Sequence, residues 1–397
     1  MNILLEQSDR LIGHTSLQFK RFLYQKINWQ SRLIGIKGAR GTGKTTMLLQ
    51  WLKEINLPSS KAAYFSLDDL YFSQYSLKET VDTFYKAGGL ILVLDEVHKY
   101  RNWAIEIKNC YDFYPELKIV FTGSSIIDLS KQQGDLSRRA IMYELPGLSF
   151  REFLWIRKVI EIEAIGLEEV LDSNSNWSRM LPSGFRPLEY FNDYLTFGYY
   201  PFILEDTGAV HQRINQLIRT IVEVDMAELK DFDVRNARKV LQLIYILALQ
   251  VPFKPNITAL ATKTGIHRNS LNNYLYYLEQ ARIISLLYPA GNSVASLQKP
   301  EKIFLNNTNL AYALAEGQVE TGAIRETFFY SQLSNLYSVE MPKQGDFLIN
   351  HKWTFEIGGK RKSREQIVKV DNAWIVKDEI ETASTGVIPL WMFGLLY

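Results

Sequence analysis

The stretch GARGTGKTT, residues 38–46, restricts the fold of this chain more than any other feature of the sequence. It fits the pattern G-x-x-x-x-G-K-[ST], follows the short apolar segment Leu33–Ile36, and precedes a segment with helical amphipathic spacing. Gly41 and Gly43 allow the backbone to curl so that its N–H groups face a phosphate, and the helix N-terminus adds a positive dipole end. The pattern therefore predicts a strand, a phosphate-binding loop and a helix.

The polar residues of this loop suit ATP or ADP bound with Mg²⁺. We expect Lys44 to hold the β- and γ-phosphates and Thr45 to ligate the magnesium ion. The expected nucleotide-binding residues are Gly38, Ala39, Arg40, Gly41, Thr42, Gly43, Lys44, Thr45 and Thr46. The alternative is a plain glycine-rich turn before a surface helix, and a second motif argues against it.

That second motif is LILVLDEVHK, in which the apolar run Leu90–Leu94 is typical of a central parallel strand. Two acids, Asp95 and Glu96, follow at the carboxyl end, where α/β folds bind their ligands. We expect Asp95 to complete the magnesium site and Glu96 to orient or deprotonate the attacking water. A solvated strand end explains these acids less well, because they follow a strand that must be central.

Length and composition indicate a globular protein of several domains. The 397 residues exceed one typical domain, and 47% of them are hydrophobic. The net charge of +2 neither demands nor excludes a polyanionic partner. A single cysteine, Cys110, suits a reducing compartment, and the longest apolar stretch, Val240–Leu249, is too short to span a bilayer. Since the N-terminus also lacks the features of a secretory signal, we expect a cytoplasmic protein without a membrane partner.

Several further segments carry a resemblance to a known family. The phosphate loop, the LDEVHK strand, TGSS at residues 122–125 and LSRRA at residues 136–140 resemble predicted AAA-superfamily ATPases of bacteria and archaea. These ATPases carry a C-terminal domain of unknown function, and the similarity continues to the closing IPLWMFGLLY. The chain departs from the pattern at Asn306 and Asn307, where relatives usually have an aspartate, and at Arg138, where glycine is common.

The resemblance implies an AAA-like domain over residues 1–148, with a parallel sheet flanked by helices. It implies that Ser124 senses the γ-phosphate, although a plain strand-end turn is an alternative. It also implies that Arg139 acts as an arginine finger toward a neighbouring subunit, which would require a homo-oligomer, with Arg138 as the second choice. The alternative for Arg139 is a cation favoured by a helix C-terminus.

The middle of the chain is expected to form a helical lid over residues 149–234 and a winged helix over residues 235–300. The second segment has a helix, a turn at Gly265, another helix and two strands, which is the winged-helix order. Four side chains at the start of the second helix are candidate DNA contacts: His267, Arg268, Asn269 and Asn272. A rigid spacer or a protein-contact module is the alternative.

The last segment, residues 301–397, is expected to contain several helices and strands, among them a helix over REQIVKV (residues 364–370) and a final apolar strand. Their order resembles the PD-(D/E)xK nuclease fold. The resemblance assigns Asp346 and Glu356 as the metal-binding acids, with Glu326 and Gln366 at accessory positions. The expected lysine is missing, because its position is Gly358; Lys360 faces the same side if the strand continues. We expect an inactive or binding-only domain, with a relocated lysine as the alternative.

The function that follows is Mg²⁺-dependent ATP binding and slow hydrolysis, coupled to a C-terminal module that binds a partner or nucleic acid. One alternative is an ATP-controlled, metal-dependent nuclease. Another is a nucleotide-switched scaffold with no nucleic-acid role. The five histidines are scattered along the chain without metal-ligand spacing, so we expect none of them to bind a metal.

Overall fold

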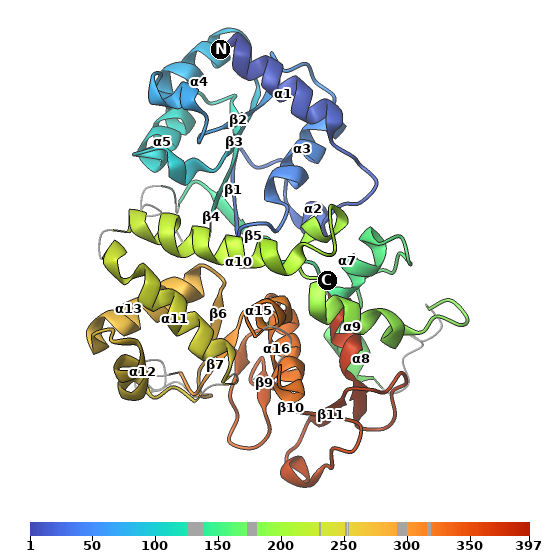
Figure 1. The fold of residues 1–397 in the computed structure, drawn as a ribbon. Coiled ribbons are helices and arrows are strands. Elements are labelled where there is room, and N and C mark those ends of the chain that lie inside the picture. The colour runs from blue at the N-terminus through green and yellow to red at the C-terminus, as the bar shows by residue number, and fades with distance from the viewer. Residues whose placement is uncertain are drawn as a thin grey trace. The chain divides into compact units, whose positions relative to one another are not determined.

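The computed structural model describes residues 1–124, 136, 138–172, 181–229, 232–250, 252, 254–291, 300–315 and 319–397. The chain divides into two compact units, residues 1–146 and residues 147–397, and each unit is described by itself (Figure 1). Among the described residues, no helix is both long and apolar enough to cross a membrane.

The first unit is built on a five-stranded sheet with the order β2-β3-β4-β1-β5, and every neighbouring pair is parallel. Strand β3 lies between β2 and β4, as expected for a strand with an unbroken apolar run. The strands are β1 (Leu33–Gly38), β2 (Ala62–Ser66), β3 (Ile91–Asp95), β4 (Lys118–Ser124) and β5 (Ile141–Glu144).

Helices cover both faces of this sheet (Figure 1). Alternate strand residues face opposite sides, so Val93 packs in one core with Met47 of α3, while Leu92 packs in another with Phe84 and Trp103. The helices are α1 (Asn2–His14), α2 (Leu23–Lys26), α3 (Lys44–Ile55), α4 (Leu77–Lys86) and α5 (Trp103–Phe113), with 3₁₀ turns η1 (Leu70–Ser73) and η2 (Val97–Lys99). Because the strands are parallel, the carboxyl ends of β1, β3 and β4 lie at the same edge of the sheet.

The second unit begins with short helices. Helix α7 is started by a capping box, in which the Ser149 hydroxyl accepts from the Glu152 N–H and the Glu152 carboxylate accepts from the Ser149 N–H. The helical elements before residue 237 are α7 (Phe150–Ile156), α8 (Leu167–Leu171), α9 (Pro187–Phe197), η4 (Pro201–Leu204), α10 (Val210–Thr220), the π-helical η5 (Ile221–Asp225), η6 (Met226–Glu228) and η7 (Val234–Asn236).

Three helices and a two-stranded antiparallel sheet follow. They are α11 (Ala237–Ala248), α12 (Ile257–Thr264), α13 (Arg268–Gln280), β6 (Ile284–Leu287) and β7 (Lys302–Leu305). The Asn256 side chain caps α12, and Gly265, with φ of 62°, makes the turn to α13. Residues 292–299, which include part of the expected hairpin connection, lie outside the described residues.

A second five-stranded sheet closes the chain, with the order β12-β11-β10-β9-β8 and a mixture of parallel and antiparallel pairs. Its strands are β8 (Val339–Glu340), β9 (Phe347–Ile349), β10 (Trp353–Gly358), β11 (Ala373–Lys377) and β12 (Val387–Pro389). The remaining elements are helices α15 (Thr308–Leu314) and α16 (Thr321–Leu333) and the 3₁₀ turns η8 (Glu365–Ile367) and η9 (Leu390–Leu395).

Two expected elements of this segment differ in the structure. The helix expected over REQIVKV is only the turn η8, because Ile367 is buried while Val368 is exposed, which leaves no apolar face to stabilise more turns. The final apolar segment is a strand only as far as Pro389, and then becomes η9, whose six residues are all buried. An apolar run without alternation does not distinguish a strand from a buried helix.

Candidate functional site

The phosphate loop connects β1 to α3 with the backbone that its glycines predict. Gly41 and Gly43 have φ values of 77° and 89°, in the left-handed region that glycine adopts without steric cost. Gly38 is needed for a different reason, since a Cβ atom there would lie 2.4 Å from the Leu145 carbonyl oxygen. Helix α3 begins at Lys44, so its free N–H groups face the loop.

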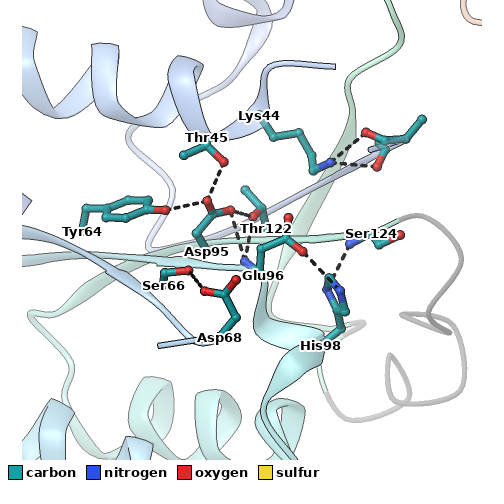
Figure 2. A network of polar contacts seen from close by, with 12 residues as sticks. Lys44, Thr45, Tyr64, Ser66, Asp68, Asp95, Glu96, His98, Thr122 and Ser124 are labelled. Atoms are coloured by element: carbon teal, nitrogen blue, oxygen red, sulfur yellow. Dashed lines mark hydrogen bonds and ion pairs between the residues drawn. The ribbon is translucent and has the colours of Figure 1, made fainter. Parts of the chain in front are cut away.

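Lys44 is buried and is turned toward its own loop. Its ammonium nitrogen donates to the carbonyl oxygens of Gly38 and Ala39, both at 2.9 Å (Figure 2). The loop is also supported from outside by Arg21, a buried side chain that donates to the carbonyl oxygens of Thr42 and, at 2.8 Å, of Pro146.

Asp95 is the centre of a hydrogen-bond network at the ends of β3 and β4 (Figure 2). Its Oδ2 accepts from the Thr45 hydroxyl at 2.6 Å and from the Tyr64 hydroxyl at 2.7 Å. Its Oδ1 accepts from the Thr122 hydroxyl and from the Glu96 N–H, the latter at 3.1 Å. Burial and the Asp95 carboxylate raise the pKa of Tyr64 far above its usual value, so this phenol stays a donor.

The arrangement of Thr45 and Asp95 fits a magnesium site. A threonine hydroxyl that donates its proton to a carboxylate keeps its oxygen lone pairs for a cation, and both groups are oxygen ligands of the kind Mg²⁺ prefers. The structure therefore brings together the two residues that the sequence assigns to the metal.

Glu96 follows Asp95 with its backbone held in an unusual conformation. Its φ of 51° lies in the left-handed region, and its N–H donates to Asp95 Oδ1 and to the Thr122 hydroxyl oxygen at 3.2 Å. Burial raises the pKa of the Glu96 carboxyl, and nearby Lys44 and Arg40 oppose that shift. A carboxylate with a raised pKa is suited to accept a proton near neutral pH.

Ser124 ends strand β4 beside this network. Its N–H donates to His98 Nδ1 at 3.3 Å, and His98 Nε2 lies 3.2 Å from Glu96 Oε2 (Figure 2). Ser124 is thus linked to Glu96 through a buried histidine that the sequence did not single out.

The two candidate finger arginines lie at the turn before β5. Arg139 makes a two-point ion pair with Asp112 of α5, at 2.8 Å and 3.0 Å, and both side chains are partly exposed. Arg138 is exposed.

Four residues around this site were not predicted from the sequence: Arg21, Tyr64, His98 and Thr122. Thr122 and Tyr64 belong to strands adjacent to β3, so strand order alone decides that they reach Asp95. Thr122 stood within the polar end TGSS and His98 within the motif LDEVHK, and these were the two available signals.

Comparisons with known proteins agree with this geometry. Residues 30–154 match a family model described as an AAA domain, and residues 188–321 match a domain of unknown function, DUF8612. Three observations indicate the same fold for the N-terminal unit: the order of its parallel sheet, its phosphate loop and its AAA-domain match. The N-terminal unit has the fold of a P-loop NTPase.

Full-length similarity extends to an uncharacterized protein of Methanocaldococcus jannaschii, which is 29% identical over 406 residues, or 93% of this chain and 85% of its own length. Solved structures with a distant likeness include an S. cerevisiae Hsp104–ADP complex (TM-score 0.35, 15% identity, 70% of this chain and 41% of that chain). Another is AMPPCP-bound DnaA from Aquifex aeolicus (TM-score 0.27, 16% identity, 70% of this chain and 90% of that chain). The AAA-domain match over residues 30–154 supports binding and hydrolysis of ATP by the N-terminal unit.

The C-terminal unit gathers a second group of acids. Glu326 of α16 and Asp346 near β9 face a common cation, Lys302, whose ammonium lies 2.8 Å from Glu326 Oε2 and 3.7 Å from Asp346 Oδ1. Asp346 also accepts the Ile357 N–H at 2.8 Å. Burial raises the pKa of Glu326, and the Lys302 ammonium opposes that shift.

Glu356 of β10 is fully buried and pairs with Lys362, not with the expected Lys360. The Gln366 amide, with its nitrogen toward Glu356, donates to Oε1 at 2.8 Å. Lys360 is exposed, and its carbonyl oxygen accepts from Lys377. A Cβ atom on Gly358 would lie 2.6 Å from Lys362 Cγ, so the glycine leaves the space through which Lys362 reaches Glu356.

Among the residues that the structure describes, no group of three or more His, Cys, Asp or Glu side chains is arranged to hold a metal ion. The cations near the C-terminal acids are therefore those of Lys302 and Lys362.

Proposed function

We propose that the N-terminal unit binds ATP with Mg²⁺ and hydrolyses it slowly. The observation that carries the proposal is the 2.6 Å hydrogen bond between Thr45 and Asp95, which joins the phosphate loop to the acidic strand at the site of the base, Glu96. Bound Mg²⁺ would neutralise charge on the phosphates. The nucleotide-binding residues are those of the loop Gly38–Thr46.

The residues of the chain have distinct roles in this proposal. The N–H groups of the loop and of the first turn of α3 bind phosphate oxygens, and Lys44 turns from the carbonyl oxygens of Gly38 and Ala39 toward the phosphates. Glu96 accepts a proton from the attacking water, and its fixed N–H keeps the side chain at the end of β3. Ser124 at the end of β4 is the proposed sensor of the γ-phosphate.

Replacing Glu96 by glutamine tests this assignment. Glu96→Gln removes the base without changing its size, so we expect unchanged ATP affinity and a rate of phosphate release lower by about 10²- to 10⁴-fold. Binding is measured with a fluorescent ATP analogue, and turnover by phosphate release. Equal turnover by wild type and Glu96→Gln would reject Glu96 as the base.

A second candidate function is nucleic-acid binding by the helices α12 and α13, which have the order of a winged helix. The observation that favours it is one-sided charge: residues 234–278 contain no aspartate or glutamate. They do contain six basic residues, namely Arg235, Arg238, Lys239, Lys254, Lys263 and Arg268. Arg235 is paired with Asp233, so the other five are the cations that can contact phosphates.

The side chains of α13 are distributed as such binding requires. His267, Arg268, Asn269 and Asn272 are exposed, whereas the bulky Tyr274 and Tyr277 are buried in the core of the unit. Lys239 of α11 donates to the Gly265 carbonyl oxygen at 2.9 Å, which adds a cation at the turn before α13. We propose that the coupled module of this ATPase is this basic surface.

Fluorescence anisotropy with labelled duplex DNA, at several salt concentrations, tests the surface. We expect affinity to fall as salt rises, and Arg268→Ala to lower the slope of log affinity against log salt by about one. Arg213→Ala, which removes a partly exposed arginine on α10 that pairs with Glu205, is the control. Absent or salt-independent binding would favour a nucleotide-switched scaffold instead.

For the C-terminal acids we propose a binding-only or structural role in place of cleavage. The support is that Lys302 already lies between Glu326 and Asp346, where a divalent ion would otherwise be needed. We expect no cleavage of labelled DNA or RNA with Mg²⁺ or Mn²⁺ and ATP. Cleavage that disappears in Asp346→Ala and in Glu356→Ala would favour the ATP-controlled nuclease.

A further inference from the structure

A histidine ties the proposed base to the strand that carries the proposed sensor. His98 lies on η2, two residues after Glu96, and its side chain is 1% exposed. One ring nitrogen, Nε2, lies 3.2 Å from Glu96 Oε2, and the other, Nδ1, accepts the N–H of Ser124 at 3.3 Å (Figure 2).

The direction of the second contact determines where the ring proton lies. The Ser124 backbone nitrogen is a donor, so Nδ1 must be the unprotonated nitrogen that accepts from it. A neutral imidazole then carries its proton on Nε2, on the side of the Glu96 carboxylate. The protonated Nε2 therefore lies beside Glu96 Oε2, at an ion-pair distance of 3.2 Å and outside the geometry of a hydrogen bond.

This contact leaves Glu96 with two different oxygens. Oε2 is the oxygen beside His98, so Oε1 is the oxygen that can accept the proton of the water. A base needs one oxygen within hydrogen-bond reach of the water, and it works best when another group fixes its orientation. Because the ring is buried and is held by β4, it is a rigid support for that orientation.

We propose that His98 is a positioning residue for ATP hydrolysis: when nucleotide is bound, its Nε2–H donates to Glu96 Oε2 and fixes the orientation of the base, while Nδ1 links that orientation to Ser124. This inference rests on the proposed function. A γ-phosphate bound at Ser124 would shift the end of β4. The His98 ring, which is held by Ser124, would pass that shift to Glu96.

Three substitutions separate the two ring contacts. His98→Leu removes both; His98→Gln keeps an amide nitrogen near the place of Nε2; His98→Asn keeps an oxygen near the place of Nδ1 but does not reach Glu96. We expect His98→Leu and His98→Asn to lower kcat by about 10- to 100-fold with ATP KM nearly unchanged, and His98→Gln to lose much less. His14→Gln, at an exposed histidine, is the control.

A kcat of His98→Leu within about twofold of wild type, or equal losses in His98→Gln and His98→Asn, would overturn the proposal. The position of the ring proton is an independent readout that needs neither turnover nor a variant that folds. Long-range ¹H–¹⁵N NMR of the wild-type protein should show His98 as the Nε2–H form, and the Nδ1–H form would overturn the proposal. If wild type does not hydrolyse ATP, the proposed function fails while this measurement still decides the contact.

Discussion

The two groups of buried acids in this chain neutralise their charge in different ways. In the N-terminal unit, Asp95 accepts from three hydroxyl groups and one backbone N–H. In the C-terminal unit, Glu326 and Glu356 each pair with an ammonium group, Lys302 and Lys362 respectively. Hydroxyl donors hold a carboxylate in place but leave its negative charge uncompensated. An ammonium group compensates that charge from within the chain.

The difference indicates which group is prepared for a ligand. A carboxylate held by neutral donors attracts a cation that arrives with a nucleotide, and the nearby Lys44 donates to two backbone carbonyl oxygens of the loop. A cluster completed by its own lysines gains less from an added cation. The comparison therefore separates a proposed reaction site from a proposed structural one.

The largest expected effect comes from removing the ammonium group beside the first group of acids. Lys44→Ala should weaken ATP binding by more than about 100-fold, because two charge-assisted hydrogen bonds to phosphates are lost. Titration with a fluorescent ATP analogue measures the affinity. Lys86→Ala, at an exposed lysine of α4, is the control. If Lys44→Ala and wild type bound ATP with equal affinity, the first group of acids would not be the nucleotide site that the comparison assumes.

Removing a built-in cation from the second group should affect stability and not ATP binding. Lys362→Met leaves the buried Glu356 carboxylate without its ammonium partner, and we expect a loss of about 2–3 kcal/mol, since the lysine is partly exposed. Urea unfolding measures the loss. Lys360→Met is the matched control, because Lys360 is exposed and lies only two residues away.

The loss should depend on pH with a definite sign. Burial raises the pKa of Glu356, so the folded protein binds this proton more tightly than the unfolded chain does. In Lys362→Met the carboxyl is neutral at low pH and costs little, while the penalty grows as pH rises through its folded-state pKa. Lys362→Met combined with Glu356→Gln should recover stability at pH 8; no recovery would mean that the pair does not carry the effect.

The smallest effect on stability belongs to a pair at the surface, which serves as a reference for both buried groups. Arg139→Ala breaks the ion pair with Asp112, and we expect the free energy of unfolding to fall by less than about 1 kcal/mol because both side chains are partly exposed.

The effect of Arg139→Ala on ATP turnover is the sharper test of the proposed arginine finger. If Arg139 acts on a neighbouring subunit, hydrolysis per molecule rises with protein concentration in wild type and in Arg138→Ala, and stays flat in Arg139→Ala. A flat wild-type profile would reject the finger.

The sequence predicts the first group better than the second because its motifs are continuous. The loop Gly38–Thr46 and the pair Asp95–Glu96 each lie in one short stretch, where local geometry determines their roles. Tyr64 and Thr122 contact Asp95 only because the strands pair in the order β2-β3-β4. That order is set by pairing between segments far apart in the sequence.

The lysine of the second group shows why spacing alone was insufficient. Strand alternation after Glu356 predicted Lys360, but the strand ends at Gly358 and the chain turns. Lys362 then crosses the space above that glycine to reach the acid. The acids Asp346 and Glu356 were placed by a resemblance over the whole segment, whereas the cation depends on the conformation of one loop.

Arg21 has a consequence for the size of the smallest fragment that can fold around the nucleotide loop. The AAA-domain match begins at residue 30, yet Arg21 supports the Thr42 carbonyl, and Gln50 and Lys53 of α3 hold the backbone of residues 13–19. A polypeptide cut at residue 30 would retain both motifs and lose these supports. The nucleotide loop therefore depends on residues 13–21, which lie before the segment that carries the motifs.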